Sequence, residues 1–394
     1  MIPEIQSRAH ALLPELIGIR RHLHSRPELS FEEWETAAFI GKELEKIGIP
    51  FKKNIAGTGI VALIEGKNPH KKCIALRADM DALPIEEANE VGYKSQNKGV
   101  MHACGHDVHT TCLLGAARIL NELKEQMEGS VKLIFQPGEE KSPGGASLMI
   151  REGVLEQPKP EAIFALHVDP ALPSGKTGFK PGRYMASADE IHLTIKGKGG
   201  HAALPHLTID PIAVAALIIT ALQQVVSRRN NPLLPSVLSF GKISGGSTTN
   251  VIPESVDIAG TFRTFDESWR REALRLIGDI ATQIASAYGA KAILKIPPGY
   301  PVLTNDPEIT EKAMSEAAAF LGKEQVCLLD YRMTAEDFAF YTLTTKGCFF
   351  RLGTNKEHKA YTAPVHNARF DIDESALATG AGIMSWLAYC FLKA

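Results

Sequence analysis

Residues 131–140 read VKLIFQPGEE, a largely apolar run that leads directly into a proline-glycine turn and two adjacent glutamates. Apolar runs of this length predict strands that are covered on both faces, because neither face presents a regular polar side to water. Similar runs occur at residues 60–64, 73–78 and 162–166. Together they predict an α/β fold with a mostly parallel central sheet and flanking helices, one of which is expected over residues 108–123.

The expected strands are followed by side chains that can bind metal or move protons. Glu139 and Glu140 follow one strand, Asp81 another and His167 a third. Ligands of open α/β sheets bind beyond the carboxyl ends of the strands. Two adjacent carboxylates at this edge could have separate roles, in which one binds a metal ion and the other accepts a proton from water. The alternatives are a solvated acidic turn and an ordinary histidine at the rim of the sheet.

The densest cluster of such groups is residues 101–109, MHACGHDVH, with three histidines, a cysteine and an aspartate. Imidazole nitrogen, thiolate sulfur and carboxylate oxygen are donors that transition-metal ions select. The alternative interpretation is a helix start with polar caps and one buried cysteine. Cys104 has polar neighbours, whereas the other five cysteines are scattered in apolar surroundings without paired spacings. This usage predicts free thiols and a reducing cytoplasm.

Composition limits the class of protein. A chain of 394 residues exceeds the usual size of one hydrophobic core, so two domains are expected. The net charge of -2 gives no reason to expect nucleic acid or an anionic membrane as partner. The N-terminus lacks a basic region followed by an apolar one, and the longest apolar stretch, residues 212–222, is too short to span a bilayer. We therefore expect a soluble cytoplasmic protein.

The sequence pattern changes after residue 182. Residues 191–195 alternate apolar and polar side chains, which is typical of a strand with one wet face. Asp210 and Pro211 predict the start of a helix, and residues 269–288 predict a second one. Further strands around them predict an α+β insert, one antiparallel sheet with two helices on one face. Near the N-terminus, residues 30–33, SFEE, match a capping box that would open a helix ending near Gly48.

Four motifs carry a resemblance to a known family. They are RADMDALP at residues 77–84, the stretch at 102–109, FQPGEE at 135–140 and GHAA at 200–203. With them the chain resembles the aminoacylase and carboxypeptidase family of metallopeptidases, and more closely its amidohydrolase branch. That branch contains hippurate hydrolases, N-acyl-amino-acid deacetylases and hydrolases of auxin–amino acid conjugates.

The resemblance implies an architecture and an activity. Residues 1–182 and 297–394 would form a zinc-peptidase-like catalytic domain, and residues 183–296 an inserted ferredoxin-like lid and dimerisation domain. The protein would be a homodimer that hydrolyses the amide bond of small N-acyl amino acids. It would use one or two divalent ions per subunit, with Zn²⁺ or Mn²⁺ expected and Co²⁺ or Ni²⁺ as alternatives.

The resemblance also implies residue roles. The metal ligands would be Cys104, His106, Glu140, His167 and His366. Glu139 would be the general base, and Asp81 would orient a ligand. In the inserted domain, His201 would steady the oxyanion, commonly across a dimer interface, while Asn250 and Arg263 would hold the substrate carboxylate.

Two departures from the family pattern leave the number and identity of the metal ions open. Asp79 stands where the wider family often has a histidine, and Cys104 where it often has a bridging aspartate. Two other functions stay open: a cysteine hydrolase with Cys104 as nucleophile and His106 or His109 as base, and a metal-binding relative without activity. The acyl group is not readable, and acetyl, benzoyl, indolyl and diaminopimelate-linked substrates are all compatible with the sequence.

Overall fold

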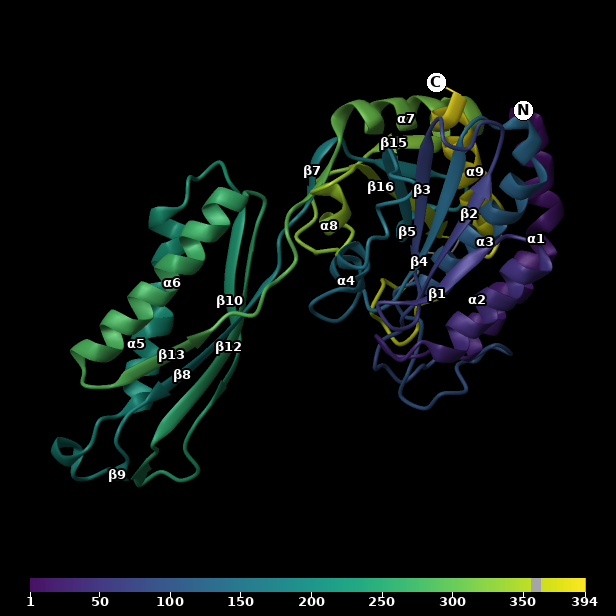
Figure 1. Ribbon diagram of the computed structural model, residues 1–394. Coiled ribbons are helices and arrows are strands. Elements are labelled where there is room, and N and C mark those ends of the chain that lie inside the picture. Colours follow the sequence, from purple (N-terminus) through teal and green to yellow (C-terminus); the bar gives the residue numbers. More distant parts are fainter. Residues whose placement is uncertain (356–362, 394) are drawn as a thin grey trace. The chain divides into compact units, whose positions relative to one another are not determined.

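The computed structural model describes residues 1–355 and 363–393, and the chain divides into two compact units (Figure 1). Each unit has its own hydrophobic core. Unit 1 consists of Met1–Gly182, Thr304–Asp330 and Asp337–Ala394, whereas unit 2 consists of Arg183–Leu303 and Tyr331–Glu336.

Unit 1 is built on an eight-stranded sheet in the order β1-β2-β4-β3-β5-β16-β6-β15. The central strands β4, β3, β5 and β16 run parallel to one another, which confirms the predicted mostly parallel sheet. Strand β3 is buried along its whole length, as its apolar sequence predicts. The strands are β1 (Phe51–Ile55), β2 (Gly59–Glu65), β3 (Cys73–Asp79), β4 (Ser130–Gln136), β5 (Ala162–Pro173), β6 (Thr177–Phe179), β15 (Val326–Leu328) and β16 (Lys346–Asn355).

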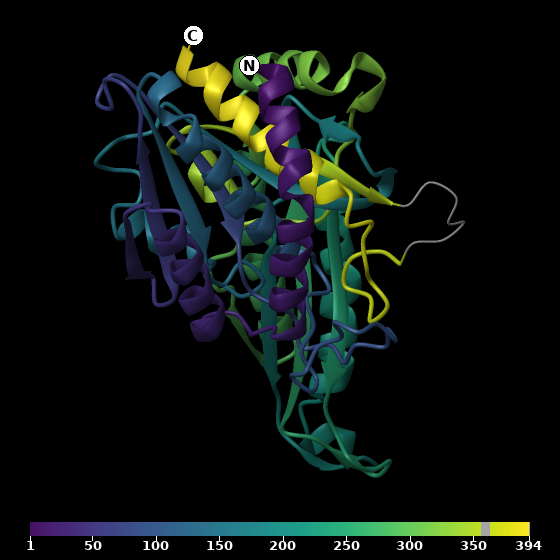
Figure 2. The same cartoon turned by 90° about the vertical axis from the view of Figure 1, so that its right-hand side faces the viewer.

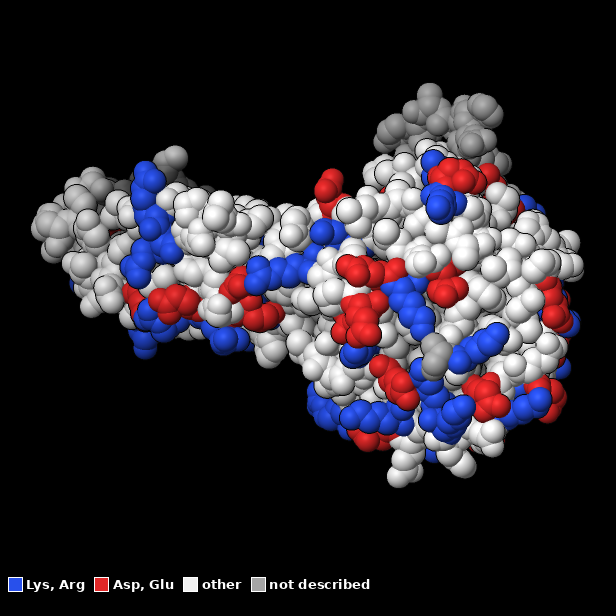
Figure 3. Space-filling view, turned by 90° about the horizontal axis from the view of Figure 1, so that it is seen from above, with Lys and Arg blue, Asp and Glu red and all other residues white. Residues whose placement is uncertain are grey.

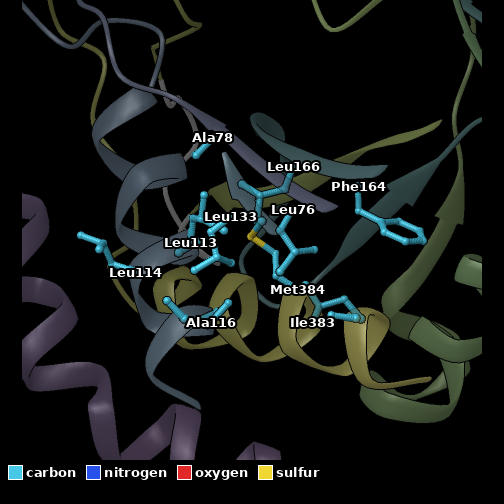
Figure 4. Packing of buried hydrophobic residues seen from close by; sticks show 14 of the residues in the cluster. Leu76, Ala78, Leu113, Leu114, Ala116, Leu133, Phe164, Leu166, Ile383 and Met384 are labelled. Carbon is cyan, nitrogen blue, oxygen red and sulfur yellow. The ribbon is translucent and has the colours of Figure 1, made fainter. Parts of the chain in front are cut away.

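Helices cover both faces of this sheet. Helices α3 and α9 pack against β3 and β5, and α1 packs against both helices (Figure 2). Leu76, Leu133 and Leu166 of the sheet meet Leu113 and Met384 of the helices in this core (Figure 4). Helices α4 and α8 contact each other and the strands β4 and β16. The helices of unit 1 are α1 (Ile2–Ser25), α2 (Trp34–Lys46), α3 (His106–Glu122), α4 (Gly145–Arg151), α7 (Pro307–Leu321), α8 (Ala339–Thr342) and α9 (Ala376–Lys393).

Unit 2 is an α+β unit whose four-stranded antiparallel sheet has the order β10-β12-β8-β13. Strand β8 alternates buried and exposed residues, so Ile191, Leu193 and Ile195 face the core as predicted. Helices α5 and α6 pack on the sheet, and the Asp210 side chain caps α5. The elements are β7 (Gly182–Met185), β8 (Asp189–Lys196), β9 (Gly200–His201), α5 (Pro211–Gln224), β10 (Ser236–Ser244), β11 (Val251–Ile252), β12 (Ser255–Thr264), α6 (Glu267–Ala287), β13 (Lys291–Lys295) and β14 (Leu303–Asn305).

The expected capping box at residues 30–33 is wrong in its role, although a helix does follow it. Helix α2 begins at Trp34 with Glu33 at the N-cap position, but the side chains of Ser30 and Glu33 make no capping hydrogen bond to it. The carboxylate of Glu28 accepts the N–H groups of Glu35 and Thr36 instead. The side chains of Ser30 and Glu33 are therefore used elsewhere in the structure.

Two apolar helical segments are long enough to cross a membrane by length and composition, Pro211–Arg229 and Ala376–Lys393. The second is mostly buried in unit 1, and the first buries one face on the sheet of unit 2, so packing accounts for much of their apolar character. On the face of the larger unit shown in Figure 3, acidic and basic side chains are interspersed.

Candidate active site

The register of the parallel strands in unit 1 places polar residues of neighbouring strands side by side. Asp79 at the end of β3 pairs with Gln136 at the end of β4, and Arg77 pairs with Ala165 of β5. His167, two residues after Ala165, therefore lies level with Asp79. Glu139 and Glu140 follow β4 in the next turn, at the carboxyl edge where open sheets bind ligands.

Helix α3 adds two more groups at this edge. It begins at His106, and Gly105 before it has a φ of 85°. A Cβ at Gly105 would lie 2.6 Å from a methyl group of Val168, so both the backbone conformation and the close approach require glycine here. This turn brings Cys104 and His106 against β5 at His167, which lies within the strand and not after its end as predicted, because β5 continues to Pro173.

The structure brings the five predicted metal ligands together. The Cys104 sulfur lies 3.4 Å from His167 Nε2, and His366 Nε2 lies 3.2 Å from Glu140 Oε1. The donor atoms of Cys104, His106 and His167 all lie within 4.8 Å of one another, as do those of Cys104, Glu140 and His366. His366 itself is half exposed, whereas Cys104, His106 and His167 are buried.

Two buried atoms of this cluster indicate whether its residues fit a bound cation. Among the described residues, His106 Nε2 and Glu140 Oε1 are buried and make no hydrogen bond, although Glu140 Oε1 lies within ion-pair distance of His366 Nε2, at 3.2 Å, and of His106 Nε2, at 3.9 Å. Burying a polar group without a partner costs about 1–3 kcal/mol, so such atoms need an explanation. A divalent cation would satisfy both, and nitrogen, sulfur and oxygen donors together are typical of transition-metal sites. The residues present therefore fit a bound divalent metal.

Asp81, the predicted orienting residue, contacts this cluster through both of its carboxylate oxygens. Its Oδ1 lies 3.1 Å from His106 Nδ1, which leaves Nε2 of that ring directed to the cluster. Its Oδ2 accepts hydrogen bonds from the Ser30 hydroxyl and from the Glu140 N–H. Burial opposes ionisation of Asp81, but the hydrogen bond and the charge of His106 outweigh it and lower the pKa of this carboxyl.

A second buried network supports His167. His109 Nδ1 lies 2.6 Å from Asp79 Oδ1, and its Nε2 accepts the Val168 N–H. The Val168 carbonyl in turn faces His167 Nδ1 at 2.8 Å. Arg77 holds the other oxygen of Asp79 at 2.6 Å. The sequence contained a signal for His109, which lies three residues after His106 on the same face of the helix, but no supporting role was predicted for it.

Glu139 is buried beside the cluster. Its Oε1 accepts a 3.4 Å hydrogen bond from the N–H of Asp337, and one donor atom each of His106, Glu139 and Glu140 lie within 4.8 Å of one another. The carboxylate of Asp337 is bound by Arg77, Gln136 and the Ala146 N–H. No role was predicted for Asp337, which lies 260 positions from Arg77.

The three predicted residues of unit 2 do not lie together. His201 of β9 pairs with Val251, and the Asn250 carbonyl accepts the Ala202 N–H, so His201 and Asn250 are neighbours beyond one end of the sheet. Arg263 lies near the opposite end of β12 and donates to the Met333 carbonyl at 3.0 Å. The chain enters and leaves unit 2 at the Arg263 end, where Ala188 pairs with Tyr300.

The protonation of the cluster predicts how a metal would bind. Burial opposes a charge on His106, but Asp79 and Asp81 outweigh it and raise its pKa to about 10. Burial and the neighbouring Glu140 and Glu139 raise the pKa of the Cys104 thiol. Both groups therefore carry protons at pH 7 in the metal-free protein, and a metal must displace them.

We expect Zn²⁺ binding to release about two protons, so that its affinity rises by up to about 100-fold per pH unit near neutrality. Calorimetric titration with Zn²⁺ in buffers of different ionisation enthalpy measures this number directly. An affinity that does not change between pH 6 and 8 would contradict the protonated state of both groups.

The chain is similar to a protein-family model, to curated proteins and to solved structures. The model of peptidase family M20/M25/M40 matches residues 75–389. N-acetyl-L-cysteine deacetylase of Bacillus subtilis is 45% identical over 92% of this chain and 85% of its own length. IAA-amino acid hydrolase ILR1-like 4 of Arabidopsis thaliana is 39% identical over 96% of this chain and 86% of its own length. The crystal structure of the Bacillus subtilis YXEP protein, described as a dinuclear metal binding peptidase, superposes with a TM-score of 0.83 at 37% identity and covers 98% of this chain and 99% of that one.

Proposed function

This chain belongs to peptidase family M20/M25/M40 and is an amidohydrolase or peptidase, and we propose that it cleaves the amide bond of N-acyl amino acids. The observation that carries the proposal is the buried Glu139 beside five side chains that can bind metal. The named activities of the deacetylase and of the IAA-amino acid hydrolase support the substrate class, since both release an amino acid from an acyl group.

We propose that Cys104, His106, Glu140, His167 and His366 hold one or two divalent ions. The dinuclear neighbour at 37% identity supports two ions, and the mixed donors suit Zn²⁺ or Mn²⁺. When bound, such an ion supplies Lewis-acid polarisation of the substrate carbonyl and lowers the pKa of a water molecule towards about 7. Asp81 keeps His106 in the tautomer that presents Nε2. His109 accepts the N–H of Val168, and the carbonyl of Val168 faces His167 Nδ1.

In this proposal Glu139 performs the proton transfers. Its carboxylate accepts a proton from the attacking water and delivers it to the nitrogen of the leaving amine. Such acid–base work contributes about 10²–10⁴-fold to the rate. The N–H of Asp337, at 3.4 Å from Oε1, helps to hold this carboxylate in place.

We propose that Arg263 and Asn250 bind the substrate carboxylate and that His201 donates a hydrogen bond to the oxyanion. The planar fork of a guanidinium suits a carboxylate, which favours acyl amino acids over simple amides. His201 and Asn250 lie at one end of the sheet of unit 2 and Arg263 at the other, which supports a homodimer in which each active site takes Arg263 from one subunit and the other two residues from its partner.

The contacts at Cys104 argue against a cysteine hydrolase. Burial raises the pKa of its thiol, which opposes the thiolate that a nucleophile needs. Both nitrogens of His109 are engaged, by Asp79 and by the Val168 N–H, so His109 has no atom left to act as its base. The retained Glu139 argues against a binding protein without activity.

The proposal is tested with a panel of N-acetyl, N-benzoyl and indole-acyl amino acids, assayed with metal-free protein and after adding Mn²⁺, Zn²⁺ or Co²⁺. We expect metal-dependent release of free amino acid from at least one acyl series. The matching simple amides, which lack the carboxylate, are the control and should be hydrolysed at least about 10-fold more slowly. Equal rates on acids and amides would contradict a carboxylate site at Arg263.

A further inference from the structure

The loop at residues 28–33 lies against the turn that carries Glu139 and Glu140. Glu33 is fully buried, and its Oε1 accepts the N–H of Gly138 at 2.8 Å and the N–H of Phe31 at 2.9 Å. Its Oε2 accepts the hydroxyl of Thr58 at 2.6 Å. One carboxylate therefore ties the residue immediately before Glu139 to a segment more than 100 positions earlier in the chain.

The same loop reaches the other glutamate through Asp81. The Ser30 hydroxyl donates to Asp81 Oδ2 at 2.6 Å, and this oxygen also accepts the Glu140 N–H at 3.0 Å. The other oxygen of Asp81 faces His106 at 3.1 Å. Ser30 thus helps to fix the rotamer of the aspartate that joins Glu140 to His106.

Phe31 lies between Ser30 and Glu33 in the sequence, and its ring packs against the turn at Gly138. Its φ of 68° is in the left-handed region, which is an uncommon conformation for a bulky residue. A Cβ added at Gly138 would lie 2.4 Å from the Phe31 ring, so the ring covers the turn at the one residue that has no side chain. Strained conformations of this kind persist where the surroundings hold them, and they concentrate at functional sites.

We propose that Ser30 and Glu33 are positioning residues for the Glu139–Glu140 turn. Glu33 orients the side chain of Glu139 through its hydrogen bond to Gly138. Ser30 orients Asp81, and Asp81 in turn orients Glu140 and His106. Neither side chain needs to touch the substrate. This inference rests on the roles proposed above for Glu139 and Glu140, and it extends the site to a motif that reads as a helix cap in the sequence.

The test compares variants of this loop by kcat, KM, Zn²⁺ affinity and Tm. We expect Glu33→Ala to lower kcat by about 10- to 100-fold with KM little changed, because small displacements of a reacting group cost rates of this order. Ser30→Ala should weaken Zn²⁺ binding by about 10-fold or more, in the range seen when outer hydrogen bonds of metal ligands are lost. Competition with a chromophoric chelator measures the Zn²⁺ affinity.

Two variants separate positioning from stability. Glu33→Gln should restore most of kcat, because its amide oxygen still accepts both N–H groups and the Thr58 hydroxyl can turn to accept from the new NH₂. Glu28→Ala removes a carboxylate of the same loop that caps α2 at Glu35 and Thr36. It should lower Tm but leave kcat and Zn²⁺ affinity unchanged.

The inference is overturned if Glu33→Ala and Ser30→Ala, like Glu28→Ala, lower Tm without changing kcat or Zn²⁺ affinity. If Glu33→Ala does not fold, Thr58→Val removes one of the three hydrogen bonds to Glu33 and should lower kcat in the same direction; an unchanged kcat would count against the inference. The Zn²⁺ competition needs no substrate, so it tests the role of Ser30 even if the proposed substrate class is wrong. A failure of the proposed function can therefore be distinguished from a failure of this inference.

Discussion

Glu139→Gln is expected to abolish most of the amide hydrolysis while the metal stays bound. A carboxamide cannot accept a proton near neutral pH, so the variant loses both proton transfers assigned to Glu139. We expect kcat to fall by about 10²–10⁴-fold. The change preserves size at a buried position, and the oxygen that accepts the Asp337 N–H can be retained, so the fold should persist.

Two measurements on Glu139→Gln decide the assignment. Bound metal is counted by elemental analysis of the purified protein, and kcat is measured at saturating substrate. Glu140→Gln is the matched comparison, since it changes the neighbouring carboxylate by the same atom and should lose metal as well as activity. Full turnover by a metal-loaded Glu139→Gln variant would show that another group is the base.

Removal of the metal is the second change with a large expected effect. Treatment with phenanthroline should reduce hydrolysis to the background rate, and addition of Mn²⁺ or Zn²⁺ should restore it. Cys104→Ala should weaken metal binding by at least about 10-fold and resist restoration at the same metal concentration. The reason is the position of its sulfur, 3.4 Å from His167 Nε2 and within 4.8 Å of the donor atoms of His106 and Glu140.

Cys112→Ala provides the control for Cys104→Ala. Cys112 lies on helix α3, which begins two residues after Cys104, and it is also buried, but its sulfur faces the Leu377 carbonyl. This variant should lose about 1 kcal/mol of stability and keep its metal and its activity. Hydrolysis that survives chelation and is abolished by alkylation of thiols would instead assign Cys104 as a nucleophile.

Much of unit 1 and of its site follows from local sequence. Apolar runs such as residues 162–166 predicted buried parallel strands, because a strand that is apolar throughout must be covered on both faces. The predicted positions of Asp81, Glu139, Glu140 and His167 follow from the same runs, since the carboxyl ends of parallel strands meet at one edge. The alternation at residues 191–195 likewise predicted one buried face in unit 2.

The supporting contacts could not be predicted in this way, because a hydrogen-bonding side chain does not encode which partner it finds. Ser30 and Glu33 have the spacing of a helix cap, yet they bind Asp81 and Gly138, while Glu28 caps the helix. Asp337 meets Arg77 only after the sheet has formed.

The sequence by itself thus determined the class of fold, the family and the side chains available for chemistry, because periodicity and motifs are local properties of the chain. The tertiary structure alone decided which of those side chains face one another. The five predicted metal ligands, Glu140 among them, come from four segments of the chain, and the 4.8 Å proximity of their donor atoms in groups of three depends on strand register and on the close approach of Gly105 to Val168. Both are products of packing between residues far apart in the chain, for which single segments carry no signal.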